Sequence, residues 1–133
     1  MPESARDAAR QTGPALEKMY QLALWLVPLI EKLPRSHKFT LGDRVQSAAL
    51  DTLLGLVQAT YSRQRRGTLR DVNLRLHDLR LLLRLMADLR LIDLRRFEHG
   101  VRRLDEVGRL VGGWLRADAA RAGTAEVESP SVA

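Results

Sequence analysis

The chain has 133 residues, of which 45% are hydrophobic, 29% charged and only 5% aromatic. With so few aromatic residues, a core must consist mainly of Leu, Val and Ala, which is typical of helical bundles because these side chains lose little freedom in a helix. The absence of cysteine excludes disulfides and thiolate metal sites and fits a reducing compartment. The longest apolar run, residues 22–30, is too short to cross a bilayer. We therefore expect a cytoplasmic protein that does not enter a membrane.

The positive charge is large and unevenly placed. Lys and Arg together number 22 against 16 acids, a formal net charge of +6. Residues 63–116 alone hold 14 arginines and 7 acids. The planar guanidinium group is suited to phosphates and carboxylates, so this half of the chain favours an anionic partner. A bundle that uses Arg only for solubility is the alternative, and charge alone does not separate the two.

The apolar residues recur at intervals of three and four, which predicts helices and no strands. The connections between these helices are short, so we expect an all-α, up-down-up-down antiparallel bundle. The two ends carry no apolar stripe and are predicted to be disordered tails. The expected division is a tail at 1–13, a four-helix bundle at 14–117 with helices at about 14–33, 40–62, 68–91 and 93–117, and a tail at 118–133.

Local signals suggest where the helices begin and which faces they bury. Residues 40–43 and 68–71 have the form of capping boxes, in which a Thr hydroxyl and an Asp carboxylate satisfy free amide groups. Asp93 is the expected N-cap of the last helix. Tyr20 and Val57 fall on the apolar stripes of the first and second helices, so we assign both to the core.

The helix at 68–91 carries more apolar residues than one core face needs. A broad arc faces the core: Leu69, Val72, Leu76, Leu79, Leu82, Leu83, Met86 and Leu89. A separate stripe consists of Leu74, Leu81 and Leu85, with Asp78 between it and the core arc. We expect this stripe to form a homo-oligomeric interface, joined by Trp25 and Leu29, which lie off the main stripe of the first helix. The alternatives are a broad core face and, for Trp25 and Leu29, a place at the core edge.

A strip of polar and basic residues lies beside the leucine stripe: Asn73, His77, Arg80 and Arg84. Arg80 has no acid three or four residues away, and Arg84 can reach only Asp88 along its own helix. Such an uncompensated pair of arginines favours an anionic ligand over a merely solvated face. The nearby Arg63, Arg65, Arg66 and Arg70 extend the basic surface, although positive charge near a helix C-terminus is also favourable by itself.

No residue pattern indicates catalysis or a cofactor. The three histidines, His37, His77 and His99, show no metal-ligand spacing, so a structural or surface role is expected for them and no metal site is predicted. No nucleophile lies beside a base, and no pair of carboxylates is placed for acid–base chemistry. We therefore expect a binding protein that is not an enzyme and needs no cofactor.

Three segments resemble the accessory variability determinant (Avd) proteins of diversity-generating retroelements. They are residues 33–39 (LPRSHKF), 79–85 (LRLLLRL) and, most specifically, 105–115 (DEVGRLVGGWL). The resemblance implies a four-helix-bundle protomer that assembles into a barrel-like homopentamer with a basic surface. It also implies binding to the reverse transcriptase and to nucleic acid, RNA or DNA, in support of mutagenic cDNA synthesis and retrohoming. Arg80 and Arg84 match the family's basic positions on the third helix, whereas the acidic tail after Arg121 departs from a basic pattern.

Two other interpretations stay open. A bundle protein encoded by intervening sequences of large-subunit ribosomal RNA has a similar loop and second-helix start, but its Asn-Ile-Ala-Glu-Gly stretch is replaced by residues 56–60 (LVQAT). A purely structural helical oligomer, positively charged for solubility, is the second alternative. The Gly-Gly-Trp segment favours the retroelement family over the ribosomal one.

Overall fold

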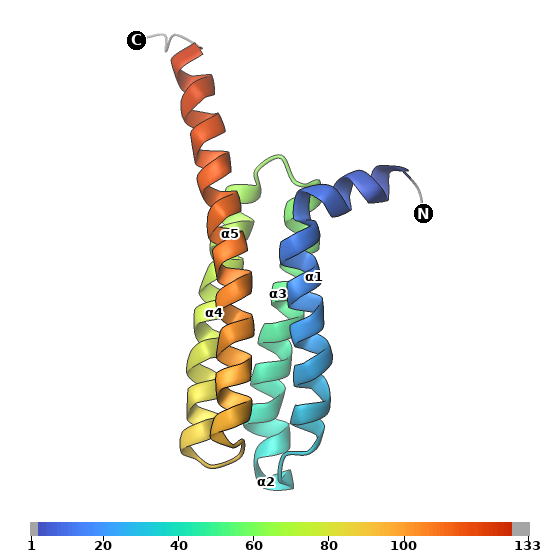
Figure 1. Ribbon diagram of the computed structural model, residues 1–133, viewed down its shortest axis with the longest axis vertical. Coiled ribbons are helices and arrows are strands. Elements are labelled where there is room, and N and C mark those ends of the chain that lie inside the picture. Colours follow the sequence, from blue (N-terminus) through green and yellow to red (C-terminus); the bar gives the residue numbers. More distant parts are fainter. Residues whose placement is uncertain (1–2, 129–133) are drawn as a thin grey trace.

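The computed structural model describes the backbone of residues 3–128 and the side chains of residues 13–121. This part of the chain is helical and contains no strand, and its long helices form the expected four-helix bundle (Figure 1). The elements are α1 (Glu3–Glu31), α2 (Arg35–His37), the π-helical turn η1 (Lys38–Gly42), α3 (Asp43–Tyr61), α4 (Arg65–Asp88) and α5 (Leu94–Glu128).

Each long helix packs against two others. Helix α3 contacts α1 and α4, and helix α5 contacts α1 and α4, so α1 and α4 lie diagonally opposite each other. The connection through α2 and the connection between α4 and α5 lie at one end of the bundle, and the connection between α3 and α4 lies at the other (Figure 1). This arrangement creates four seams between neighbouring helices, and the seams on either side of α5 carry the basic residues discussed below.

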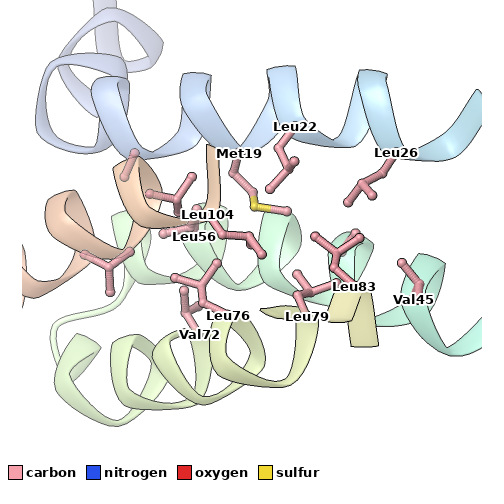
Figure 2. Close-up of a cluster of buried hydrophobic side chains, with 14 of the residues drawn as sticks. Met19, Leu22, Leu26, Val45, Leu56, Val72, Leu76, Leu79, Leu83 and Leu104 are labelled. Carbon is pink, nitrogen blue, oxygen red and sulfur yellow. The ribbon is translucent and has the colours of Figure 1, made fainter. Parts of the chain in front are cut away.

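The core is built from aliphatic side chains of all four long helices (Figure 2). Met19 of α1, Leu56 of α3 and Leu104 of α5 lie at its centre and are fully or almost fully buried. Burying one such side chain stabilises the fold by roughly 1.5–3 kcal/mol. Most of the predicted core arc of α4 is buried as expected: Leu69, Val72, Leu76, Leu79, Leu83 and Met86.

Three residues assigned to the core from periodicity are exposed instead. Tyr20 is 48% exposed, Val57 38% and Leu89 48%. Leu89 lies at the C-terminal cap of α4, beyond the last helical turn that faces the core. Tyr20 and Val57 lie at the exposed edges of their predicted stripes, while central members of those stripes, such as Met19 and Leu56, are fully buried. Leu22, at the edge of the α1 stripe opposite Tyr20, is fully buried.

The helix starts also differ from the capping-box predictions. Helix α4 begins at Arg65, so Thr68 lies inside its first turns and caps nothing. Thr40 lies within η1, where its hydroxyl donates a hydrogen bond to the His37 carbonyl at 3.4 Å. In both cases the residues before the threonine already belong to a helical element, so the threonine does not lie at a helix start. Asp93 is confirmed as the cap of α5, since its Oδ1 accepts a hydrogen bond from the Arg96 amide at 2.8 Å.

The terminal helices extend beyond the bundle. Residues 3–13 belong to α1 and residues 118–128 to α5, although disordered tails are expected there from composition. Extending a formed helix avoids the cost of nucleation, so residues without an apolar stripe can continue one. The first turns of α1 bend away from the bundle (Figure 1), and we assign this bend to Pro14, which lies inside α1. The remaining tail residues, 1–2 and 129–133, lie outside the described part.

None of the described helices is long and apolar enough to cross a bilayer.

Candidate functional site

An open groove of about 420 Å³ runs along the seam between α4 and α5. Four of its lining residues carry basic or imidazole side chains, and one is a carboxylate. Three residues of the predicted basic strip, Asn73, His77 and Arg80, lie in this groove together. The complete lining is Asn73, Leu76, His77, Arg80, Leu104, Asp105, Gly108, Arg109, Gly112 and Arg116.

Glycines on α5 give the groove its depth. A Cβ atom added at Gly108 would meet nothing within 4 Å, so the space above this residue is open. At Gly112 an added Cβ would come within 3.4 Å of the Arg116 guanidinium, an ordinary contact with a flexible side chain. The α5 backbone is therefore accessible between the arginines, which lets a ligand approach closely.

Arg80 forms an ion pair that the count of neighbours along its own helix did not predict. Its Nη2 donates a hydrogen bond to Oδ1 of Asp105, which comes from α5 and is 25 positions away in the sequence. The description of Arg80 as uncompensated is therefore wrong. The two side chains remain 47% and 41% exposed, so the pair orients the guanidinium at the groove while leaving part of it open to solvent.

This pairing leaves other cations of the groove free. Asp105 lies four residues before Arg109, the spacing of an ordinary surface pair, but in the structure it pairs with Arg80. Among the residues that the structure describes, neither Arg109 nor Arg116 forms an ion pair. Neither arginine is among the candidates predicted from the sequence, although their spacing of seven beside Gly108 and Gly112 places them on one face of α5.

Arg84 lies apart from the groove. It pairs with Asp88 at 3.9 Å, the partner expected from the sequence, and both side chains are 71% exposed. An exposed pair at this distance contributes little, so the Arg84 guanidinium remains available to a ligand. Because Arg84 is one helical turn beyond Arg80, it extends the basic surface of α4 toward the end that connects with α5.

The arginines at and just before the start of α4 are of two kinds. Arg65 lies 5.5 Å from the ring centroid of Trp114 and pairs with Asp118 at 3.5 Å, so it fastens the start of α4 to α5. Its side chain is 21% exposed, and the structure thus gives Arg65 an intramolecular role. Arg63, Arg66 and Arg70 are exposed and form no ion pair within the described part of the chain.

The leucine stripe of α4 is exposed, as expected for an apolar surface separate from the core. Leu74, Leu81 and Leu85 are 63%, 65% and 44% exposed. Leu81 lines a shallow groove on the α3 side of α4, together with Arg44, Asp51 and other residues of that seam. Leu82 is half-buried at the edge of the core.

Trp25 and Leu29 do not continue this stripe. Both are half-buried and pack against the core. The Trp25 ring lies 4.8 Å from that of His99, on the seam between α1 and α5, whereas Leu81 faces the α3–α4 seam. The five residues therefore do not form one continuous surface of the protomer, because α1 and α4 are diagonally opposed in the bundle. Trp25 and Leu29 take the alternative place at the edge of the core.

A second exposed apolar surface lies on α1 and α3. Its six members are Tyr20, Leu24, Leu50, Leu54, Val57 and Tyr61, whose exposed fractions range from 38% to 71%. The four α3 residues recur at intervals of four, three and four, so they share one face of the helix. This spacing is visible in the sequence, but assigning Val57 to the core breaks the series, so the exposed α3 stripe is not predicted.

No group of three or more metal-binding side chains is placed to hold an ion among the described residues. The chemistry of the α4–α5 groove is instead that of hydrogen-bond donors. Guanidinium, imidazole and amide groups converge there beside exposed glycine backbone, an arrangement suited to binding an anion.

Comparisons with known proteins define the family of this chain. A family model described as bAvd-like matches residues 15–117, which is the whole bundle and most of the chain. No curated protein and no solved structure matches the chain significantly. Avd-like proteins are accessory, non-catalytic proteins of diversity-generating retroelements. The chain belongs to the bAvd-like family, and at the level of that family it is a retroelement accessory protein.

Proposed function

We propose that this protein binds the reverse transcriptase and the nucleic acid of its retroelement, using the α4–α5 groove for the phosphate backbone. The observation that carries the proposal is the arrangement of Arg80, Arg109 and Arg116 around the accessible backbone of Gly108. Phosphate contacts supply most of the sequence-independent affinity for nucleic acid. Arg80 is positioned for such contacts by Asp105, while the other two arginines carry unpaired charge.

The neighbouring basic residues support an extended contact. Arg84 continues the line from Arg80 toward one end of the bundle, and Arg63, Arg66 and Arg70 lie near the other end. A strand bound along the groove would thus meet positive charge over most of the length of α4. The contact to the reverse transcriptase is supported by membership of the family and by the same basic surface, which also suits an acidic protein face.

Assembly into a ring is the second part of the proposal. The protomer exposes two different apolar surfaces, the α4 leucine stripe and the α1–α3 surface around Leu54. When one surface of a protomer binds a different surface of the next, the contact is heterologous, and such contacts close into rings when the rotation permits. A homopentamer, implied by the family resemblance, is the expected closed form. The basic α4–α5 groove would then repeat around the assembly.

The test of the groove is a double variant, Arg109→Gln with Arg116→Gln. We expect RNA and DNA affinity to fall about tenfold or more at low salt, with a shallower salt dependence, because each lost phosphate contact removes roughly 0.7–0.9 from the slope of log affinity against log salt. The matched control is Arg44→Gln with Arg75→Gln, which removes the same charge from the charge-balanced α3–α4 seam. Equal losses in both double variants would show that only net charge matters and would overturn the groove assignment.

A pull-down with the reverse transcriptase, using the same two variants, tests the protein partner. Retention by the control and loss by the groove variant is the expected pattern. A protein that assembles normally yet retains neither the polymerase nor nucleic acid would instead be a purely structural oligomer. A gene located within a ribosomal RNA operon, without a reverse transcriptase nearby, would favour the ribosomal intervening-sequence class.

A further inference from the structure

A second basic pocket, of about 400 Å³, lies on the other side of α5, between α5 and α1. It occupies the first turns of α5, whereas the α4–α5 groove lies along the middle of that helix. The two sites share no residue. The pocket is lined by Trp25, Asp93, Arg95, Arg96, His99 and Arg102.

The indole of Trp25 is held in place at this pocket by α5. A Cβ atom added at Gly100 would lie 3.2 Å from Cζ3 of Trp25, so the glycine is what allows the ring to lie this close to the helix. The imidazole of His99 lies beside the indole, with ring centroids 4.8 Å apart and planes inclined by 49°. Trp25 is thus a positioned aromatic group that still contributes surface to the pocket.

The side chains around the indole are mostly basic, and most of them have no anionic partner among the described residues. Arg95, His99 and Arg102 are spaced at four and three positions and therefore share one face of α5. Asp93 is the one carboxylate among the described residues that line the pocket. It is already engaged, since it caps the Arg96 amide at 2.8 Å and pairs with the Arg96 guanidinium at 2.6 Å.

Arg95 and Arg102 consequently have no anionic partner in the part of the chain that the structure describes. Glu98, four residues before Arg102 on α5, forms no ion pair with it there. Packing at the edge of the core explains why Trp25 is half-buried, but it does not explain the two unpaired arginines that line the same pocket.

We propose that this pocket binds single-stranded nucleic acid, with a base stacked on Trp25 and the flanking phosphates held by Arg95 and Arg102. Aromatic side chains combined with a cationic groove are the usual means of binding single strands without sequence preference. An acidic protein segment would use the arginines but would gain little from the indole. The inference rests on the proposed function in one respect, that the protein binds nucleic acid, and it adds a site on a different seam.

Tryptophan fluorescence provides a local reading of this site. The chain has two tryptophans, so the Trp114→Phe variant retains Trp25 as its single indole. A short oligothymidylate should quench the fluorescence of this variant on binding, because a base would lie against the ring. An abasic oligonucleotide of the same length carries the phosphates alone and should bind with little quenching. Equal quenching by both probes, or none by either while binding proceeds, would overturn the stacked arrangement.

The charged residues are tested by Arg95→Gln with Arg102→Gln in the same background. We expect oligothymidylate affinity to fall about tenfold and the salt slope to become shallower by about 1.4, as for two lost single-strand phosphate contacts. Both positions are exposed, so urea unfolding should stay close to that of the parent. Poly-glutamate serves as the probe for an acidic protein. If it binds as tightly as the oligonucleotide and shows the same loss, the pocket is a protein-binding site instead.

The two proposals fail in different ways. If the pocket variant binds and is quenched as its parent while the Arg109→Gln, Arg116→Gln variant loses binding, the pocket inference is wrong and the groove stands. If the pocket variant alone loses binding, the inference holds and the groove assignment is wrong. Absence of all binding by the parent protein would overturn the proposed function and this inference together.

Discussion

Arg80 of α4 and Asp105 of α5 join the two helices across the proposed nucleic-acid groove, with a guanidinium donor and a carboxylate acceptor. The pair has two consequences for charge. It holds Arg80 at the groove, and it occupies the carboxylate that Arg109 would otherwise reach along α5. Asp105 therefore sets how much positive charge the groove presents.

Replacing Asp105 by Asn should strengthen nucleic-acid binding. The change leaves Arg80 unpaired and removes the negative charge of Asp105 from the groove, so affinity should rise several-fold at low salt and fall more steeply as salt is added. Because the pair is exposed, stability should drop by only about 0.2–1 kcal/mol. Fluorescence anisotropy with labelled RNA, across a salt series, measures the first effect and urea unfolding the second.

The control for that experiment is Asp51→Asn, which makes the same charge change on the balanced α3–α4 seam. It should leave affinity within about twofold of the parent, since screening weakens charges beyond about 8–10 Å. Unchanged or weaker binding by Asp105→Asn would contradict this prediction. It would show that the ligand binds the intact Arg80–Asp105 pair and not Arg80 alone.

Aspartate substitutions on the two apolar surfaces should reveal how the subunits assemble. Leu81→Asp and Leu54→Asp each place a charge in an exposed apolar surface, so both should reduce the assembly to smaller species in light scattering. In a heterologous interface each variant keeps one intact surface. An equimolar mixture of the two should therefore form a heterodimer.

The two variants measured separately distinguish the other possible interfaces. Normal assembly of Leu54→Asp, with dissociation of Leu81→Asp, would indicate an interface between two α4 stripes. Full assembly of both variants would exclude the two apolar surfaces as contacts. Gln58, exposed on α3 between Leu54 and Tyr61 in sequence, offers a conservative control, because Gln58→Asn should not change the assembly.

Two glycines should respond in opposite directions to alanine. A Cβ at Gly55 would come 2.8 Å from Cγ2 of Val72, a fully buried side chain, so Gly55→Ala should lower the free energy of unfolding by about 1–2 kcal/mol through overpacking. Gly108→Ala meets open space and should raise it by about 0.5–1 kcal/mol, as expected for a helix interior. Urea unfolding of the two variants gives both values, and a stabilised Gly55→Ala would contradict the tight α3–α4 crossing.

Arg90 occupies a backbone conformation that favours glycine. Its φ is +60°, and the Leu91 amide donates to the Met86 carbonyl at 2.8 Å, the hydrogen bond that closes a helix with a left-handed residue after it. Arg90→Gly should raise the free energy of unfolding by about 0.5–1 kcal/mol, because glycine removes the steric cost of this conformation. Arg90→Ala is the control, since it removes the side chain but keeps the strain. Equal stability of the two variants would exclude strain as the cause.

The class of fold and the separateness of the leucine stripe could both be predicted from local spacing in the sequence. Helical periodicity is a local property, so the four bundle helices, the Asp93 cap and the outward position of Leu74, Leu81 and Leu85 followed from spacing alone. The family also followed from short segments of sequence. These features depend on residues no more than a few turns apart.

Which faces and charges come together depends on how the helices pack against one another. Two apolar stripes fit on α3, and packing against α1 and α4 selects the one that is buried, which leaves Leu54 and Val57 outside. The pair between Arg80 and Asp105 spans 25 positions, and no count along one helix can find it. Trp25 likewise meets His99 because α1 and α5 are neighbours in the bundle. Both sites proposed for nucleic acid lie on seams, and a seam exists only once two helices have packed.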